Sequence, residues 1–330
     1  MKCSAVFLRA LGATIATLGA ALTLAAGPVL GQSWPSKPIR VIVPLTAGSA
    51  TDVIPRIVFE QVSAQLGQSM VVENRVGGGG TIGVAAVAKA EPDGYTILVH
   101  SNAHAIAPAV HLNLPYDVVK DFSGITPLGN VPNVLVVAPS KKIKTIQELV
   151  ALAKAKPGSI NYASGGTGTP PHLTAERFRM SAGFEGQHIP FKGAPEALTE
   201  VMTGRVDFYF SPIAPALPFI RDGKLLALAV SSTKRASALP EVPTTVEAGY
   251  ANSDFDFWSG MFVPGKTPRE IVLKLHQETV KALQSANVKG KLANLGVEPM
   301  ILTPEDFDKR VATEVATAAT LAKAAGIAAQ

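Results

Sequence analysis

The feature that most constrains the fold of this chain is an alternation of short apolar runs with amphipathic helical stretches, which begins at Lys37. Residues 39–43 are rich in Val and Ile and end at Pro44, as a buried strand would. The stretch that follows, to Leu66, carries apolar residues at helical spacing. Repetition of strand, helix and strand favours parallel pairing with helices packed on the sheet. The pattern therefore predicts the α/β class.

The same alternation continues to the end of the chain. The predicted strands are 39–43, 70–72, 95–99, 134–137, 160–163, 188–191, 206–210, 225–230 and 261–263. The predicted helices are 52–66, 81–90, 145–156, 172–182, 269–284 and 304–323. Pro170 and Pro171 stand just before one of these helices, where proline is favoured.

The length of 330 residues favours two domains, and an apolar content of 47% is ample for a core. The formal charge of +5 comes from 30 basic and 25 acidic residues spread evenly along the chain. A balance this mild does not indicate a nucleic-acid partner.

The first 31 residues have the pattern of a secretory signal. Lys2 and Arg9 precede an apolar stretch, residues 10–26, which is followed by small and turn-forming residues. We therefore predict a signal peptide over residues 1–31 and a periplasmic mature protein. Cleavage after Ala26 and after Gly31 are both open, and a single membrane anchor is the alternative.

Cys3 is the only cysteine and lies inside this leader. A mature chain without cysteine has no disulfide, thiol nucleophile, iron–sulfur cluster or cysteine-rich zinc site. An exported domain of this size can form a sufficient core without disulfides.

The connection after the first predicted strand, residues 44–52, is polar and rich in small residues. Ligands bind at the carboxyl ends of strands in open α/β sheets, and the N–H groups and dipole of a helix start favour an anion. No Lys or Arg lies between Pro44 and Ile54, so neutral donors would hold that anion. A plain connector with Asp52 as helix cap is the alternative. The candidate ligand-binding residues are Thr46, Ala47, Gly48, Ser49, Thr51 and Asp52.

A second connection, residues 164–172, has the same chemistry. It also lies between a predicted strand and a predicted helix, but it lacks the Gly-Lys-[Ser/Thr] ending of a phosphate-binding P-loop. A small anion such as a carboxylate suits it, and a glycine-rich surface loop is the alternative. Two such connections in separate parts of the chain favour one shared ligand. The candidate ligand-binding residues are Ser164, Gly165, Thr167, Gly168, Thr169 and His172.

Ser101, Asn102 and His104 follow another predicted strand and are candidates to line the same cleft. The histidines of this region lack the Glu of the His-Glu-x-x-His zinc motif, so we predict no metal site. Residues 78–83 match G-x-G-x-x-G formally, but no Asp or Glu stands where it could hold a ribose, so we predict no cofactor. The G-x-S-x-G elbow of many hydrolases is absent from the sequence.

Taken together, these segments resemble the tripartite tricarboxylate transporter receptor family, also called Bug receptors. The likeness extends over nearly the whole mature chain and depends on many short fragments in a fixed order. The fragments are residues 34–44, Gly48 with Asp52 and Arg56, 72–75 with 77–80, 92–96, 114–117 with 120–122, 161–165, 190–193, 239–244 and 247–249.

The resemblance implies an exported receptor of the two-lobed, type II periplasmic-binding-protein (Venus-flytrap) architecture. Such a receptor captures a small carboxylate, whether a di- or tricarboxylate, an amino acid or an aromatic acid, and delivers it to the permease subunits of a tripartite tricarboxylate transporter. In this family the loops that correspond to residues 45–52 and 164–169 hold the carboxylate, partly through ordered waters. The chain departs from the family at Leu45, usually aromatic, at Ser49, usually glycine, and at Val76, often proline. The first two departures lie in the loop predicted to hold the carboxylate, and they leave the ligand's identity open.

Two lobes require two chain crossings, which we place near residues 130–134 and 253–258. Lobe 1 then comprises residues 34–131 and 254–330, and lobe 2 comprises residues 132–253. Hinge closure would exclude water from the ligand. We expect a monomer that binds its ligand without catalysis. The alternatives are an extracytoplasmic enzyme that acts on a carboxylated substrate and a ligand-sensing partner of a sensor kinase.

Overall fold

The computed structural model describes residues 34–324, 326, 327 and 329. Lys37–Gln330 forms one compact unit that contains two sheets. The predicted signal peptide, residues 1–31, lies outside the described residues. Within the described part of the chain, no helix combines the length and the apolar character needed to cross a membrane.

The first sheet has five strands in the order β2-β1-β3-β10-β4. Its members are β1 (Ile39–Val43), β2 (Met70–Asn74), β3 (Thr96–Ser101), β4 (Phe122–Asn130) and β10 (Trp258–Pro264). As the alternation predicts, β1 is parallel to β2 and β3. In contrast, β10 is antiparallel to both of its neighbours, β3 and β4.

The second sheet repeats this plan in the order β7-β6-β8-β5-β9. Its members are β5 (Asn133–Val137), β6 (Asn161–Ser164), β7 (Gln187–Pro190), β8 (Phe208–Pro212) and β9 (Leu226–Val230). Here β6 is parallel to β7 and β8, while β5 is antiparallel to β8 and β9. Each sheet therefore holds one antiparallel strand, and in both that strand is the first one after the chain arrives from the other sheet.

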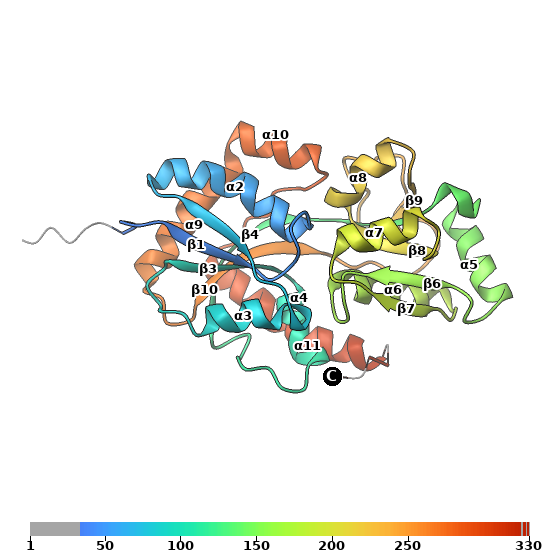
Figure 1. Ribbon diagram of the computed structural model, residues 1–330, viewed down its shortest axis with the longest axis horizontal. Coiled ribbons are helices and arrows are strands. Elements are labelled where there is room, and N and C mark those ends of the chain that lie inside the picture. Colours follow the sequence, from blue (N-terminus) through green and yellow to red (C-terminus); the bar gives the residue numbers. More distant parts are fainter. Residues whose placement is uncertain (1–33, 325, 328, 330) are drawn as a thin grey trace, which may run out of the picture. The chain divides into compact units, whose positions relative to one another are not determined.

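Helices connect the strands and cover the sheets (Figure 1). Those that follow or precede strands of the first sheet are η1 (Gly78–Gly80), α2 (Ala50–Leu66), α3 (Thr81–Ala88), α4 (Ala103–Val110), α9 (Arg269–Gln284), α10 (Ala286–Asn294) and α11 (Pro304–Ala324). Those of the second sheet are η2 (Pro139–Lys141), α5 (Ile146–Ala155), α6 (Pro170–Ala182), α7 (Ala194–Met202) and α8 (Ile213–Arg221). The sequence patterns do not predict β4, α4, α7, α8 or α10. Pro108, Pro218 and Gly290 lie inside three of these helices and lower their intrinsic helix propensity.

Each sheet has its own apolar core. In the first, Trp258 and Phe262 of β10 pack with Phe307 of α11, and all three are essentially buried. In the second, Phe178 of α6 packs against Phe210 of β8. Burial of side chains of this size contributes about 1.5–3 kcal/mol each. Each sheet thus packs its own helices, and a smaller cluster of Val110, Leu173 and Ala318 joins helices of the two sheets.

The chain crosses between the sheets twice. It passes from β4 to β5 within residues 130–133, and it returns from β9 to β10 within residues 230–258. The two crossings are hydrogen-bonded to each other, because the Val131 N–H donates to the Phe257 carbonyl at 2.7 Å. The Ser231 N–H also donates to the Asn133 carbonyl at 2.8 Å.

Candidate ligand-binding site

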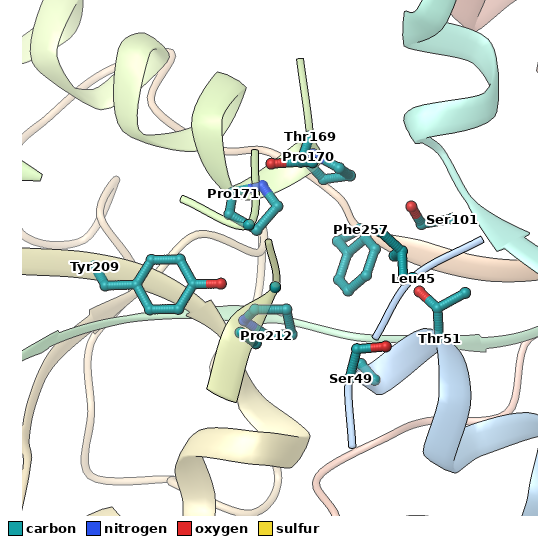
Figure 2. A pocket seen from close by; sticks show the side chains of 14 residues that line it. Leu45, Ser49, Thr51, Ser101, Thr169, Pro170, Pro171, Tyr209, Pro212 and Phe257 are labelled. Carbon is teal, nitrogen blue, oxygen red and sulfur yellow. The ribbon is translucent and has the colours of Figure 1, made fainter. Parts of the chain in front are cut away.

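One cavity is lined by residues that follow strands of both sheets (Figure 2). It lies at the carboxyl ends of β1, β3, β6 and β8, the edge at which α/β sheets bind ligands. Its volume is about 390 Å³, including space that is open to solvent. We call it the main cavity, and its lining residues are Leu45, Ser49, Ala50, Thr51, Ser101, Gly165, Thr169, Pro170, Pro171, Gly193, Ala194, Tyr209, Pro212 and Phe257.

The two sides of the main cavity touch each other. A Cβ atom added to Gly193, which precedes α7, would lie 2.1 Å from the Thr46 hydroxyl oxygen on the other side. A Cβ atom added to Gly168 would lie 2.4 Å from a methyl carbon of Val110 in α4. Only hydrogen at these Cα positions permits the approach. Segments of the two sheets are thus in contact at the margins of the cavity.

The first loop, residues 44–52, presents hydrogen-bonding groups that have no partner. The hydroxyl oxygens of Thr46, Ser49 and Thr51 are buried and form no hydrogen bond with the described residues. Ala50 and Thr51 begin α2, and their backbone N–H groups have no acceptor in the described chain. Buried polar groups are normally paired. Hydroxyls and N–H groups gathered at a helix start are the kind of groups that can bind an anion.

Asp52 holds this loop in place and does not line the main cavity. Its carboxylate accepts hydrogen bonds from the Gly48 N–H at 2.9 Å, the Asn74 amide at 2.9 Å and the Arg56 guanidinium at 3.0 Å. Burial alone would raise the pKa of Asp52, but the hydrogen bonds from Arg56, Gly48 and Asn74 together lower it. Asp52 is therefore charged, and the charge is balanced by Arg56.

The second loop, residues 164–172, uses the hydroxyls of Ser164 and Thr169 internally. The Ser164 hydroxyl donates to the Gly166 carbonyl at 3.0 Å and lies 2.6 Å from Nε2 of His188. The Thr169 hydroxyl donates to the same carbonyl at 2.7 Å. His172 accepts the Gly168 N–H at Nδ1, 3.1 Å away, and its ring stacks on His188 at 3.7 Å. These contacts fix the loop and occupy the hydroxyls of Ser164 and Thr169.

Two histidines of this network are held neutral. Burial lowers the pKa of His172 to about 4 and that of His188 to about 3. A neutral imidazole has one nitrogen free to accept a hydrogen bond, and in His172 that nitrogen receives the Gly168 N–H. The second loop therefore depends on uncharged histidines, whereas the first depends on an ion pair.

The helix start at the second loop also differs from the predicted chemistry. Pro170 and Pro171 are the first residues of α6, and proline has no N–H to offer an anion. They contribute apolar wall instead. Ala194 is the first residue of α7, and its backbone N–H donates no hydrogen bond to the described residues. Sequence reasoning missed Gly193 and Ala194 as site residues, although their place after a strand was a usable signal.

Tyr209 of β8 was also missed by sequence reasoning. Its side chain is fully buried, and burial raises the pKa of its phenol, an effect that the neighbouring Ser211 hydroxyl partly offsets. The separation and angles between the two hydroxyls do not meet the geometry of a hydrogen bond. In Figure 2 the phenol points into the main cavity from the side opposite Ser49 and Thr51. Strand residues at alternate positions face opposite ways, and the apolar run around Tyr209 gave no sign of which face meets a cavity.

Of the predicted site residues, the main cavity is lined by Ser49, Thr51, Ser101, Gly165 and Thr169. The others lie elsewhere in the loops or on other features. Asn102 lines a second cavity beside Arg310, and Thr167 lines a third beside His111. His104 packs between Phe122 and Phe262 in the first core, where burial lowers its pKa to about 3.

The remaining predicted residues shape the loops. Thr46, Ala47 and Gly48 belong to the first loop but are not among the lining residues of the main cavity. The same is true of Ser164 in the second loop. No Lys, Arg, His, Asp or Glu is among the lining residues of the main cavity. In the part of the chain that the structure describes, no group of three or more His, Cys, Asp or Glu side chains is placed to hold a metal ion.

Two mixed sheets, joined by two crossings and sharing a cavity at the ends of their strands, define the fold of periplasmic binding proteins. The structure of the periplasmic binding protein BugD superimposes on this chain with a TM-score of 0.85 at 32% identity, covering 90% of this chain and 100% of BugD. The chain belongs to the tripartite tricarboxylate transporter receptor family, which it matches over residues 54–327. The family inferred from the sequence is therefore confirmed.

Two further relatives support this assignment. Protein BugT of Bordetella pertussis is 36% identical over 310 residues, which cover 93% of this chain and 94% of BugT. An R. palustris protein solved with adipate has a TM-score of 0.87 at 32% identity, and the match covers 90% of this chain and all of that one. Proteins similar to this chain therefore include one that was solved with a small carboxylate.

Proposed function

We propose that this protein is an extracytoplasmic receptor that captures a small carboxylate in the main cavity. The observation that carries the proposal is the set of unpartnered donors in the first loop: the hydroxyls of Thr46, Ser49 and Thr51 and the N–H groups at the start of α2. Hydrogen bonds to a charged group contribute about 1.5–3 kcal/mol each. A few such bonds give useful affinity without a cationic side chain.

We further propose that each sheet, with its helices, is one lobe. Lobe 1 comprises residues 34–131 and 254–330, and lobe 2 comprises residues 132–253. The change of sheet between β4 and β5 and the return before β10 support these boundaries. Rotation about the two hydrogen-bonded crossings would part Thr46 from Gly193 and admit the ligand.

The partner in this proposal is the permease of a tripartite tricarboxylate transporter, and the location is the periplasm. Membership of the receptor family supports both. The cavity also lacks the usual means of catalysis among its lining residues, which include no histidine, carboxylate or cation to act as acid, base or electrophile. That composition supports binding without turnover.

The test is thermal unfolding of the purified chain, freed of bound compounds by refolding, against a panel of straight-chain acids of four to six carbons. The panel contains unsubstituted acids, their terminal hydroxy derivatives and the matching dicarboxylates. A ligand at a hundred times its dissociation constant stabilises the folded state by about 2.7 kcal/mol and raises the melting temperature. The matched primary alcohols, which lack the carboxylate, should have no effect.

Ser49→Ala combined with Thr51→Val provides the site control. This variant keeps the fold but removes two unpartnered hydroxyls, so it should lose the stabilisation that the acids give to the wild type. If no acid stabilises the wild type, or if the variant responds as the wild type does, the carboxylate assignment fails.

A further inference from the structure

The second cavity, which Asn102 and Arg310 line, lies between helices of the two sheets. Its walls come from α4 and α11 of the first sheet, from α6 of the second and from residues 254–256 of the crossing that returns to β10 (Figure 1). Its volume is about 690 Å³, including space that is open to solvent. It shares no lining residue with the main cavity, so the proposed function does not use it.

Asn102, which precedes α4, brings an unpartnered acceptor to this cavity. The residue is 3% exposed, and its Oδ1 forms no hydrogen bond with the described residues. Its Nδ2 donates to the Asp256 carbonyl at 3.0 Å. Because a carbonyl can only accept, that bond fixes which end of the amide is free. Buried polar atoms are normally paired, so the free oxygen of Asn102 calls for a donor from outside the chain.

The charged side chains of the second cavity leave one carboxylate in excess. Asp254, Asp256 and Glu314 line it, against the two guanidiniums of Arg177 and Arg310. Arg310 donates to Glu314 at 2.7 Å, and Arg177 lies 3.7 Å from Asp254. In the described chain, the Asp256 carboxylate is left with Arg310 at 3.9 Å, beyond hydrogen-bonding distance. The cavity therefore favours a cation.

The surroundings of these acceptors suit an organic cation. Within the described residues, no group of three or more His, Cys, Asp or Glu side chains converges as a metal ion would require. Much of the wall is apolar. Ile106, Leu173 and Ala318 belong to the cluster that joins helices of the two sheets, and Phe255 and Leu321 pack against it. Hydrocarbon that covers such a surface is removed from water, which is favourable.

We propose that the second cavity binds a primary alkylammonium ion. Its N–H groups donate to Oδ1 of Asn102 and to the carboxylate of Asp256, two residues that their own hydrogen bond brings together, and its hydrocarbon chain covers the apolar wall. A quaternary ammonium ion has the charge but no N–H group. An alcohol has a donor but no charge. Neither meets both requirements of the site.

The experiment is an NMR titration of the purified chain with n-butylammonium chloride at pH 7.5 and constant ionic strength. The signals followed are the side-chain amide of Asn102 and the indole N–H of Trp258, which donates to Glu314 in the cavity wall at 2.9 Å. Both signals should shift saturably and give one dissociation constant. Tetramethylammonium and 1-butanol should each bind about tenfold more weakly, because the first loses the hydrogen bonds and the second loses the charge.

Asp256→Asn tests the excess charge at nearly constant side-chain size and should weaken binding of n-butylammonium about tenfold. Asp222→Asn is the matched control, because Asp222 is also exposed, lies 3.6 Å from Lys224 and lines neither cavity. It should bind n-butylammonium as the wild type does. The double variant Ser49→Ala with Thr51→Val should do so as well, since its changes lie in the main cavity.

The outcomes decide on the second cavity alone. If neither signal shifts saturably, water satisfies Asn102 and the proposal is overturned. Equal binding of tetramethylammonium or 1-butanol overturns it too, as does an Asp256→Asn variant that binds like the wild type. Loss of binding in the double variant would place the ammonium ion in the main cavity instead. The wild-type comparison of the three compounds decides even if a variant does not fold, and the acids test the proposed function separately.

Discussion

The two loops at the main cavity have similar sequences and opposite uses for their hydroxyl groups. In the first loop, Ser49 and Thr51 are buried without partners. In the second, the hydroxyls of Ser164 and Thr169 both donate to the Gly166 carbonyl. The difference teaches that residue type shows which donors exist, whereas only the local backbone shows which of them remain free for a ligand.

The supports of the loops differ as well. The first loop is held by the charged pair of Asp52 and Arg56, and the second by the neutral rings of His172 and His188. Each loop is therefore rigid for a different electrostatic reason. The following predictions test that contrast, and the largest expected effect comes first.

Gly193→Ala should have the largest effect, because the new methyl group would overlap the Thr46 hydroxyl at 2.1 Å and hold the two sides apart. Overpacking costs about 3 kcal/mol, roughly a hundredfold in affinity for the panel acid that binds the wild type best. Gly290→Ala is the control, since no atom lies within 4 Å of its Cβ position. Calorimetry measures both, and equal affinities in the two variants would contradict a closed cavity.

The matched pair Thr51→Val and Thr169→Val should separate ligand binding from loop stability. Thr51→Val removes a free hydroxyl and should weaken binding of the best panel acid by about 2 kcal/mol, or about 30-fold, at unchanged stability. Thr169→Val breaks the 2.7 Å bond to Gly166 and should lower the free energy of unfolding by about 1 kcal/mol with a small effect on affinity. Calorimetry and urea unfolding give the two quantities. The reverse pattern would mean that the second loop supplies the donors.

Asp52→Ala should lower the free energy of unfolding by about 1.5 kcal/mol, because the N–H of Gly48 and the amide of Asn74 lose their acceptor. It should also weaken binding of the best panel acid, since the first loop is no longer held. Glu60→Ala removes a carboxylate from α2 whose side chain is 68% exposed and paired with Lys291, and should change stability by less than about 0.5 kcal/mol. Urea unfolding with calorimetry compares them. Equal affinities would remove Asp52 from the support of the site.

Acid should loosen the second loop before the first. In the folded chain the pKa of His172 is about 4, against an ordinary value of 6.5. The unfolded chain therefore binds a proton that the folded chain does not, and the free energy of unfolding falls as the pH drops below 6.5. The loss at pH 5.5 is about 1 kcal/mol for this group. Asp52 has a lowered pKa, so its contribution is complete above 3.8 and disappears only as the pH falls through the folded value.

Hydrogen exchange measures this difference at two amides, that of Gly168, which donates to His172, and that of Gly48, which donates to Asp52. Between pH 7 and 5.5 the protection factor of Gly168 should fall relative to that of Gly48. A parallel change at both amides would show that the loops open together and would remove the histidines from the support of the second loop.

Much of the fold could be predicted from the spacing of apolar residues along the sequence. Strands such as β1 and helices such as α9 have strong patterns, and their alternation gives the α/β class. The antiparallel direction of β5 and β10 could not be predicted in this way, because the period of a strand is the same in both directions. The direction follows from the crossings, which depend on contacts between residues far apart in the chain.

The site was predicted less completely than the fold. The connections after β1 and β6 were found because a strand end followed by small polar residues is a local signal. Tyr209 was missed because it lies in an apolar run, and Phe257 because no strand end or small polar run marks it. Both reach the cavity only through the way the two sheets are brought together. Asn102 and His104 follow the right strand, but α4 carries them into a second cavity and into the core.

The return of β10 to the first sheet interlocks the polypeptide. A single cut between Asn130 and Asn133 would leave β10 on the C-terminal fragment, although it pairs with β3 and β4 of the N-terminal fragment. Separation of the fragments would require a strand to be pulled from between two neighbours, with all its ladder hydrogen bonds broken together. A nick at this crossing should therefore leave a tightly associated pair of fragments rather than two halves that drift apart, and the same two fragments, made separately, are natural candidates for a reassembling split protein.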